Sequence, residues 1–346
     1  IEVNQATYIN NTNEENALLV LMEYFLANDE TIFLITPNLY KAQLLYDKLS
    51  QVMDSSHICF FPQDEFVTNE LLVSSMEFRV ERIHTIKRII SKQIVVANLY
   101  GVLKPELPLD AWKQSRIHIQ KDNEYSINEL SEKLINYGYK KEYTVEKIGD
   151  FSVRGGIVDV YPLGAKNPYR LDFFGETLEV IKEFDIDSQK SINTIDYIDL
   201  LPMVEFFYND EELDILLDLI ETKISESHFD DETIKMLHND EECLKNHDEL
   251  DRLIRYLPFL TQTHYTVLDL APSKRLFFFD YHRIIEQNKI LIEEIKDWYV
   301  SSNDYTKMKF SMLYDFNETL INNTVMIDYL EYRYKTNGAP VLPVFG

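Results

Sequence analysis

Two strand-like runs separated by only two residues constrain the fold of this chain more tightly than any other feature. The runs are Tyr169–Phe174 and Thr177–Phe184, and a Gly-Glu pair at 175–176 joins them. A two-residue loop that begins with glycine is typical of a type II′ β-hairpin, and it also sets the register of the two strands. Counting outward from this turn, we expect Arg170 to face Ile181 across the ladder.

This register separates a core face of the hairpin from a solvated face. The core face is expected to hold Leu171, Phe173, Leu178 and Val180. The opposite face is expected to carry Arg170, Asp172, Phe174 and Glu179. Asp172 and Glu179 would face each other, and like charges are costly in an apolar interior, so this second face is solvated. A single exposed aromatic residue usually carries no function, but an arginine beside it is typical of a binding hot spot.

The chain has 346 residues, which suffices for two domains or for one domain with an insertion. Its net charge is −25, and residues 201–260 hold 17 Asp and Glu against 5 Lys and Arg. A surface of this sign repels the phosphate backbone of nucleic acids. We interpret the acidic segment as a solvated helical face that aids solubility, with a docking surface for a basic partner as the alternative.

The two cysteines, Cys59 and Cys243, support neither a disulfide framework nor a zinc site, and the cytoplasm is the expected compartment. The apolar runs are too short to span a bilayer, and no basic and then apolar leader opens the chain, so no membrane contact is expected. The chain starts without Met, from which we expect an excised fragment of a longer protein.

Helix-like and strand-like runs alternate through the first hundred residues. Helical periodicity covers residues 16–26 and 76–91, whereas residues 31–36, 57–61 and 93–97 have the composition of buried strands. Such alternation predicts a parallel sheet. Repeated prolines between residues 103 and 108 interrupt the pattern, and we expect a domain boundary near them.

A second, strand-rich unit follows, and the chain then returns to the first pattern. Ser126 and Glu129 form a capping box ahead of a helix that leads into the strand-rich region 139–187. Beyond residue 202 the chain is acidic and helical, and we expect strands at 265–268 and 275–279 and a long helix from 281 to about 301. The simplest architecture is a parent α/β domain, made of residues 1–115 and 202–346, that is split by an inserted α+β domain at residues 116–201.

The sequence does not support a nucleotide site of the P-loop type. The first glycine is Gly101, and a phosphate loop needs glycine so that backbone amides can approach the phosphates. Asn10, Asn11 and Thr12 occupy the place where such a loop would precede the first helix. They could cap that helix, but the lysine that reaches the outer phosphates is missing.

Other residues with catalytic potential are interpreted as structural. Asp64 and Glu65 formally offer paired carboxylates, but acidic residues are so frequent here that a role in a loop or at a helix start is favoured. His57 and Cys59 alternate on a predicted strand, which formally allows a nucleophile with a base. A buried structural cysteine is favoured, because no third group is in place to orient the base.

Three ordered motifs in the middle of the chain resemble a known repair domain. FSVRGGIVDVYP at 151–162, PYRLDFFGE at 168–176 and FDIDSQKS at 184–191 resemble the insertion domain shared by the nucleotide-excision-repair protein UvrB and the transcription-repair coupling factor (Mfd) family. FFPQDEF at 60–66 and IVVANLYGVL at 94–103 are similar to the split domain that surrounds it. The resemblance covers nearly the whole chain, and it implies a degenerate P-loop-NTPase-like parallel-sheet domain split by a module like domain 2 of UvrB.

Two departures distinguish between the two families. UvrB carries a P-loop at its start and a long hairpin after the strand that corresponds to residues 94–98, whereas this chain has no early glycine and only a short proline-bearing link at that point. The chain is therefore more similar to the Mfd family, whose N-terminal module is a degenerate copy of UvrB.

The resemblance implies a partner-binding function without catalysis in this part of the protein. In the family, the module recruits UvrA, the damage-recognition ATPase, to lesions where RNA polymerase has stalled. By motif position, the residues expected to bind UvrA are Arg154, Arg170 and Phe174, and neither a cofactor nor a metal is expected. The resemblance also implies a DNA translocase motor, which uses ATP and Mg, and contacts with RNA polymerase and DNA in the remainder of the protein. In the family, the C-terminal region masks the UvrA-binding surface.

Two further interpretations remain open at this point. The first is a UvrB-like protein that is loaded onto damaged DNA with ATP and has lost only its visible P-loop. The second is an acidic scaffold with no affinity for UvrA. A nucleotide-binding assay separates the first from UvrA recruitment, and a binding assay with UvrA separates the second.

Overall fold

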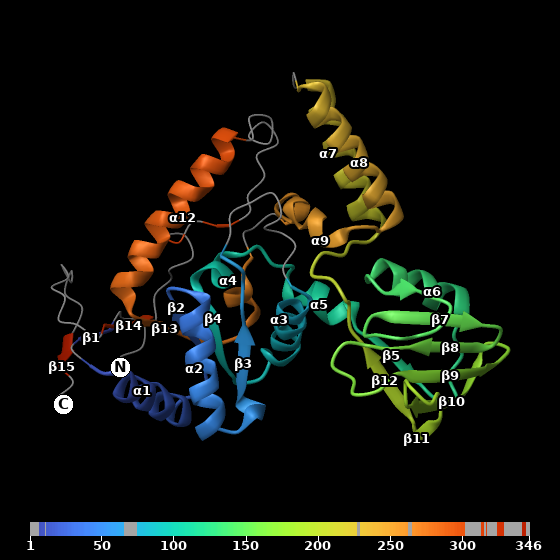
Figure 1. Ribbon diagram of the computed structural model, residues 1–346, viewed down its shortest axis with the longest axis horizontal. Helices are drawn as coiled ribbons and strands as arrows, with labels where there is room; N and C mark the ends of the chain where they lie inside the picture. The colour runs from blue at the N-terminus through green and yellow to red at the C-terminus, as the bar shows by residue number, and fades with distance from the viewer. Residues whose placement is uncertain are drawn as a thin grey trace. The chain divides into compact units, whose positions relative to one another are not determined.

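The computed structural model describes residues 7–10, 12–65, 75–226, 229–261, 265–301, 313–314, 316, 324–328 and 341–343 (Figure 1). Asn11 and the last residue of the FFPQDEF motif, Phe66, lie outside these residues. The chain divides into two compact units, of which unit 1 is Ile1–Pro108 with Leu257–Gly346 and unit 2 is Leu109–Tyr256. Unit 1 is therefore discontinuous in sequence, with unit 2 inserted into it.

Unit 1 is built on a parallel sheet, and this confirms the predicted α/β class. Among the described residues its strand order is β15-β1-β14-β13-β2-β4-β3. The strands are β1 (Thr7–Asn10), β2 (Thr31–Thr36), β3 (Ile58–Phe61), β4 (Ile94–Asn98), β13 (Lys274–Phe279), β14 (Thr324–Ile327) and β15 (Val341–Pro343). Every residue of β2, β3 and β4 is buried, as expected for strands whose two faces are both covered.

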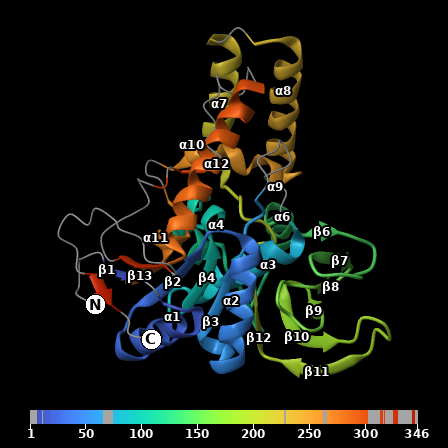
Figure 2. The ribbon, with the colours of Figure 1, turned by 60° about the vertical axis from the view of Figure 1, so that its left-hand side comes forward.

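Helices cover both faces of this sheet (Figure 2). The helices of unit 1 are α1 (Glu14–Ala27), α2 (Leu39–Val52), η1 (Ser55–His57), α3 (Met76–Arg88), α4 (Leu99–Leu103), α10 (Leu257–Leu260), α11 (Val267–Leu270) and α12 (Tyr281–Ser301). α1 and α2 pack against Leu34, Val96 and Phe277 on one face of the sheet. α4 and α11 contribute to a small apolar cavity on the other face, which Ile35 and Phe278 also line.

The strand expected at residues 265–268 is wrong, because this segment begins helix α11. Thr266 caps the helix by accepting a hydrogen bond from the Leu268 backbone N–H, and the Asp269 side chain accepts one from the Thr266 backbone N–H. The β-branched and aromatic composition of this segment favours a strand, whereas the Thr-x-x-Asp spacing is that of a capping box. The capping box prevails here, since it satisfies the backbone N–H groups at the helix start.

Unit 2 contains an inserted sheet and a group of acidic helices. Its six-stranded sheet has the order β11-β10-β9-β8-β7-β6 within the described residues, and β12 pairs with β5 in a separate ladder. The strands are β5 (Ile117–Gln120), β6 (Lys140–Lys141), β7 (Asp150–Arg154), β8 (Ile157–Val160), β9 (Tyr169–Phe174), β10 (Thr177–Phe184), β11 (Ser191–Ile195) and β12 (Tyr197–Leu200). The helices are α5 (Leu109–Ser115), α6 (Ile127–Asn136), α7 (Asp210–Glu226), α8 (Asp231–Asn246), α9 (Leu250–Leu253) and η2 (Ile254–Tyr256).

The observed boundaries of the units differ from the boundaries expected at residues 115 and 201, since unit 2 also includes residues 202–256. In this segment α7 and α8 lie side by side (Figure 1), and the fully buried Asp240 of α8 is bonded to Arg255 and Tyr256. The Tyr208 hydroxyl donates to the Leu244 carbonyl at 2.7 Å. These contacts join the acidic helices to one another within unit 2, and composition alone does not reveal them.

Candidate partner-binding surface

The predicted hairpin between β9 and β10 is present, and its turn has the expected geometry. Gly175 has a φ of 64°, whereas Glu176 keeps a negative φ, the combination that a type II′ turn requires. Phe174 pairs with Thr177, as counting from the turn predicts. Farther from the turn a β-bulge between Leu178 and Val180 shifts the register by one residue.

The bulge corrects the predicted cross-strand pairs. Arg170 faces Lys182 instead of Ile181, and Asp172 faces Val180 instead of Glu179. The bulge lies between the start of β10, which is hydrogen-bonded to residues 122–125, and the later part of β10, which pairs with β11. The sequence of the hairpin alone does not show that β10 has one neighbour at its start and another neighbour farther along.

The bulge also changes which residues form the core of the sheet. Leu171, Leu178 and Ile181 are fully buried, whereas Phe173 and Val180, which were expected in the core, are only partly buried. The shift in register brings Ile181 opposite Leu171, and these two residues pack on the same face.

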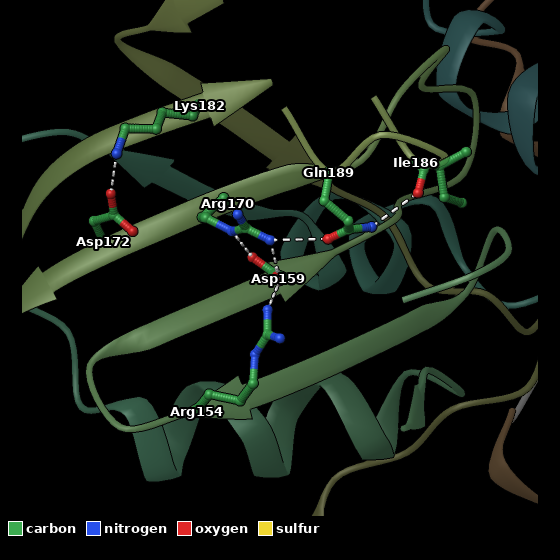
Figure 3. A network of polar contacts seen from close by, with 7 residues as sticks. All are labelled: Arg154, Asp159, Arg170, Asp172, Lys182, Ile186 and Gln189. Atoms are coloured by element: carbon green, nitrogen blue, oxygen red, sulfur yellow. Dashed lines mark hydrogen bonds and ion pairs between the residues drawn. The ribbon is translucent and has the colours of Figure 1, made fainter. Parts of the chain in front are cut away.

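The other face of β9 carries Arg170, Asp172 and Phe174 at alternate positions, as expected. Asp172 forms an ion pair with Lys182 of β10 (Figure 3), so the like-charge contact that was expected between Asp172 and Glu179 does not occur. Phe174 is 77% exposed beside the turn, a large value for an aromatic side chain. A solvent-accessible face with an aromatic residue and three charged groups, Arg170, Asp172 and Lys182, is therefore present on this sheet.

Arg154 joins this face from the last position of β7, beside the turn that leads to β8. It pairs with Ile157 across the ladder, and Ile157 in turn pairs with Asp172 of β9. The turn approaches β9 closely, because a Cβ on Gly156 would lie 2.7 Å from the Phe173 carbonyl oxygen. Only glycine fits at position 156, so Gly156 allows the turn after Arg154 to lie close against β9.

The structure brings Arg154 and Arg170 together through Asp159 of β8, a residue that the sequence analysis did not single out (Figure 3). Asp159 accepts hydrogen bonds from Arg154 Nη2 at 2.5 Å and from Arg170 Nε and Nη2 at 2.6 and 2.8 Å. We call these three residues the Arg-Asp-Arg cluster. The signal for Asp159 is its position opposite Arg170 on β8, which becomes visible only when the pairing of β8 with β9 is known.

The two arginines differ in their surroundings. The Arg170 side chain is 19% exposed, stacks over the Phe184 ring at 4.5 Å and donates to Gln189 at 3.2 Å. Its hydrogen bond with Asp159 raises the pKa of the Arg170 guanidinium, which therefore stays charged. The Arg154 side chain is 41% exposed. Arg154 and Phe174 are thus the more accessible of the three predicted residues, and Arg170 is largely engaged within the protein.

The residues that were weighed as catalytic candidates lie elsewhere, in unit 1. Cys59 is buried in β3, and burial raises the pKa of its thiol to about 11, so it is a poor nucleophile near neutral pH. His57 lies in η1 with its ring against Phe25, and not on the strand with Cys59 as expected. Glu65 accepts hydrogen bonds from the Leu39 backbone N–H and from Asn98, which is the structural role favoured above.

The described residues contain neither a metal-binding cluster nor a membrane-spanning helix. No cluster of three or more His, Cys, Asp and Glu side chains suitable for a metal ion occurs among them. No helix in the same part of the chain combines the length and apolar character needed to cross a bilayer. Cys59 and Cys243 are both free thiols.

Residues 117–206 match the model of the UvrB interaction domain family, and this range contains the Arg-Asp-Arg cluster and Phe174. The chain is 31% identical over 281 residues to the transcription-repair-coupling factor of Bacillus subtilis. The aligned region covers 78% of this chain and 24% of that protein. It is 28% identical over 320 residues to the transcription-repair-coupling factor of Staphylococcus haemolyticus, and the aligned region covers 88% of this chain and 27% of that protein.

The chain thus spans about a quarter of the length of these relatives. The matched relatives cover most of both units, and the family model falls on the inserted sheet. Over most of its length the chain is similar to transcription-repair-coupling factors, and its inserted sheet matches the UvrB interaction domain family.

Proposed function

We propose that the exposed face of the six-stranded sheet recruits UvrA, the damage-recognition ATPase of nucleotide excision repair. The observation that carries this proposal is the coincidence of the UvrB interaction domain match with a solvated face on which Phe174 is exposed beside the Arg-Asp-Arg cluster. Aromatic and arginine side chains dominate the binding energy of protein interfaces, and both occur here on one face.

The chemistry of the face suits an acidic partner surface with an apolar pocket. Two guanidinium groups share one carboxylate in the cluster, which leaves one net positive charge there. Asp172 and Lys182 neutralise each other in their ion pair. A carboxylate of UvrA would bind the accessible donors of Arg154 with planar, charge-assisted hydrogen bonds, and Phe174 would supply the apolar anchor.

In the full-length protein, this module would act in transcription-coupled repair in the cytoplasm. We infer that it hands a lesion exposed by removal of a stalled RNA polymerase to UvrA and needs no catalysis of its own. ATP and Mg, the contacts with RNA polymerase and DNA, and the C-terminal region that masks the UvrA-binding surface would belong to the three-quarters of the relatives' length that the chain does not cover.

A direct titration of the chain with UvrA by calorimetry tests this proposal. We expect a saturable complex of the two proteins in the absence of DNA and nucleotide. A parent chain that produces no heat and no co-elution with UvrA at tens of micromolar would overturn the proposed function and would favour the acidic scaffold.

The alternative of an ATP-dependent loading protein is disfavoured by the residues at the carboxyl end of the unit 1 sheet. Ligands of open parallel sheets bind at this edge. In this protein it carries two carboxylates, the buried Asp328 after β14 and the half-buried Asp280 after β13. Burial raises the pKa of Asp280, and Asp328 accepts a hydrogen bond from the His282 backbone N–H at 2.9 Å.

The start of α1 is similarly unsuited to bind phosphate. Asn13 caps the helix by accepting a bond from Asn16, and Glu14 in the first turn forms ion pairs with Lys41 and Lys48. The lysines near the helix start therefore already have a carboxylate partner. We expect no binding of ATP with Mg by calorimetry, and saturable binding at micromolar concentration would restore the ATP-dependent alternative.

A further inference from the structure

We propose that Asp159 is a positioning residue for the UvrA-binding surface: its buried carboxylate holds the guanidinium groups of Arg154 and Arg170 ready for the partner. The inference rests on the proposed function of this face. It assigns a role to a residue that touches UvrA only through its two neighbours.

The strand order places Asp159 between the two arginines. Arg154 lies on β7, Asp159 on β8 and Arg170 on β9, and these three strands are adjacent in the sheet. Asp159 and Arg170 are direct cross-strand partners, so their side chains emerge on the same face. The two arginine side chains converge on the carboxylate from opposite sides (Figure 3). Both carboxylate oxygens of Asp159 therefore carry an arginine hydrogen bond.

The burial of Asp159 fixes the positions of both arginine side chains. The Asp159 side chain is only 2% exposed, and a buried carboxylate has to be paired with cations and hydrogen-bond donors. Without its charge, the two guanidinium groups would face each other with like charges and would separate. With the carboxylate present, both arginines lose their rotamer freedom when the protein folds, so this entropic cost does not arise when the partner binds.

The two arginines then have different tasks. Arg170 is tied to Asp159, to Gln189 and to the ring of Phe184, and it acts as a support that completes the buried pair. Gln189 is itself held by a bond to the Ile186 carbonyl, which anchors the loop after β10 (Figure 3). Within the described residues Arg154 makes a single side-chain hydrogen bond, so most of its five N–H donors remain available for a partner.

The test uses Asp159→Asn, which keeps the size of the side chain and removes its charge. We expect Asp159→Asn to weaken UvrA binding about ten-fold in calorimetry, because both arginines become mobile. The matched control is Asp199→Asn. Asp199 is also a largely buried carboxylate shared by two side chains, the Arg116 guanidinium and the His118 ring, but it lies on β12 in the separate ladder. This control should bind UvrA like the parent chain.

A double-mutant cycle separates positioning from general destabilisation. If Asp159 acts by holding the arginines, Asp159→Asn should weaken binding less than about two-fold when Arg154 is already alanine. Full additivity of the two changes, or unchanged affinity of Asp159→Asn alone, overturns the proposal. Asp159→Glu keeps the charge but displaces it, and it replaces Asp159→Asn in the same cycle if the latter does not fold.

A second measurement needs neither a variant nor UvrA. Nitrogen-15 relaxation of the arginine Nε–H groups in the parent chain should show restricted motion for both Arg154 and Arg170, since Asp159 holds both guanidinium groups. Mobile side chains at Arg154 and Arg170 would overturn the positioning role, even if UvrA binds. A parent chain with restricted arginines that does not bind UvrA would instead refute the proposed function.

Discussion

The parallel sheet of unit 1 and the six-stranded sheet of unit 2 use their strands in opposite ways. Every residue of β2 is buried, because helices cover both faces of its sheet. Along β9 only Leu171 is buried, and the other residues are partly or fully accessible. A strand with one accessible face can present side chains to a partner, whereas a strand covered on both faces can only support the fold.

The charged residues of the two units follow the same difference. In unit 1 the carboxylates at the sheet edge and at the start of α1 are buried or paired within the unit. In unit 2 the Arg-Asp-Arg cluster is also internally paired, but it leaves one net positive charge beside the exposed Phe174. A charged group that is paired within the protein can therefore still bind a partner. It does so only when the pairing leaves a net charge, and hydrogen-bond donors, accessible at the surface.

The largest expected effect tests the contrast between the sheets themselves. Phe33→Ala and Leu34→Ala replace consecutive, fully buried residues of β2, so both should lower the free energy of unfolding by about 3 kcal/mol. On β9 only Leu171→Ala should do so, since its neighbours along the strand are accessible. Urea unfolding, with hydrogen exchange to report each unit separately, measures this. Equal tolerance at Phe33 and Leu34 would contradict the two-sided burial of β2.

The next effect concerns affinity rather than stability. Arg154→Ala and Phe174→Ala should each weaken UvrA binding by about 2 kcal/mol, which is roughly 30-fold, if the face is a hot spot. Their unfolding free energies should change by only about 0.5 kcal/mol, because both side chains are accessible.

Two accessible residues of unit 2 serve as controls for this measurement. Tyr143 is 86% exposed, and Arg116, which directly precedes β5, has a 51% exposed side chain. Tyr143→Ala and Arg116→Ala should therefore bind UvrA like the parent chain. A loss of affinity in the control variants equal to that of Phe174→Ala would mean that UvrA binds another surface.

Arg170→Ala should affect both properties, in contrast to the other two site residues. Removal of the guanidinium leaves the buried Asp159 with Arg154 as its remaining cation in the cluster, and we expect a loss of stability of about 1.5 kcal/mol. The sequence alone predicts that Arg170→Ala folds like the parent, because it places Arg170 on a solvated face. Thermal unfolding distinguishes the two expectations, and an unchanged melting temperature would contradict the supporting role of Arg170.

The smallest effect tests the paired charges of unit 1. Burial alone would raise the pKa of Glu14, but the hydrogen bonds and charges of Lys41 and Lys48 together lower it below its ordinary value of 4.5. A lowered folded-state pKa stabilises the protein above pH 4.5, and this contribution is lost as the pH falls through the folded-state pKa.

Glu14→Gln should therefore lower the unfolding free energy by about 0.5 kcal/mol at pH 7 and have a smaller effect near pH 3. Melting curves of the parent chain and the variant across this range provide the measurement. A difference in stability that grows as the pH falls would have the wrong sign for this ion pair.

Local pattern was sufficient for several elements. Alternating helices and strands predicted the parallel sheet, and the Gly-Glu pair predicted the turn of the hairpin. The S-x-x-E motif marked the start of α6, where Ser126 accepts a bond from the Glu129 backbone N–H. These features depend on residues a few positions apart, so the information lies within a short window of sequence.

The sequence by itself determined the class of the fold, the hairpin turn and the family to which the motifs belong. Only the tertiary structure decided that a bulge brings Ile181 into the core, and that Asp159 on β8 joins Arg154 of β7 to Arg170 of β9. Pairing between β8 and β9 brings together residues that are eleven positions apart across a loop, and β10 changes its neighbouring strand along its length. Such contacts depend on the packing of the whole sheet, and no local periodicity encodes them.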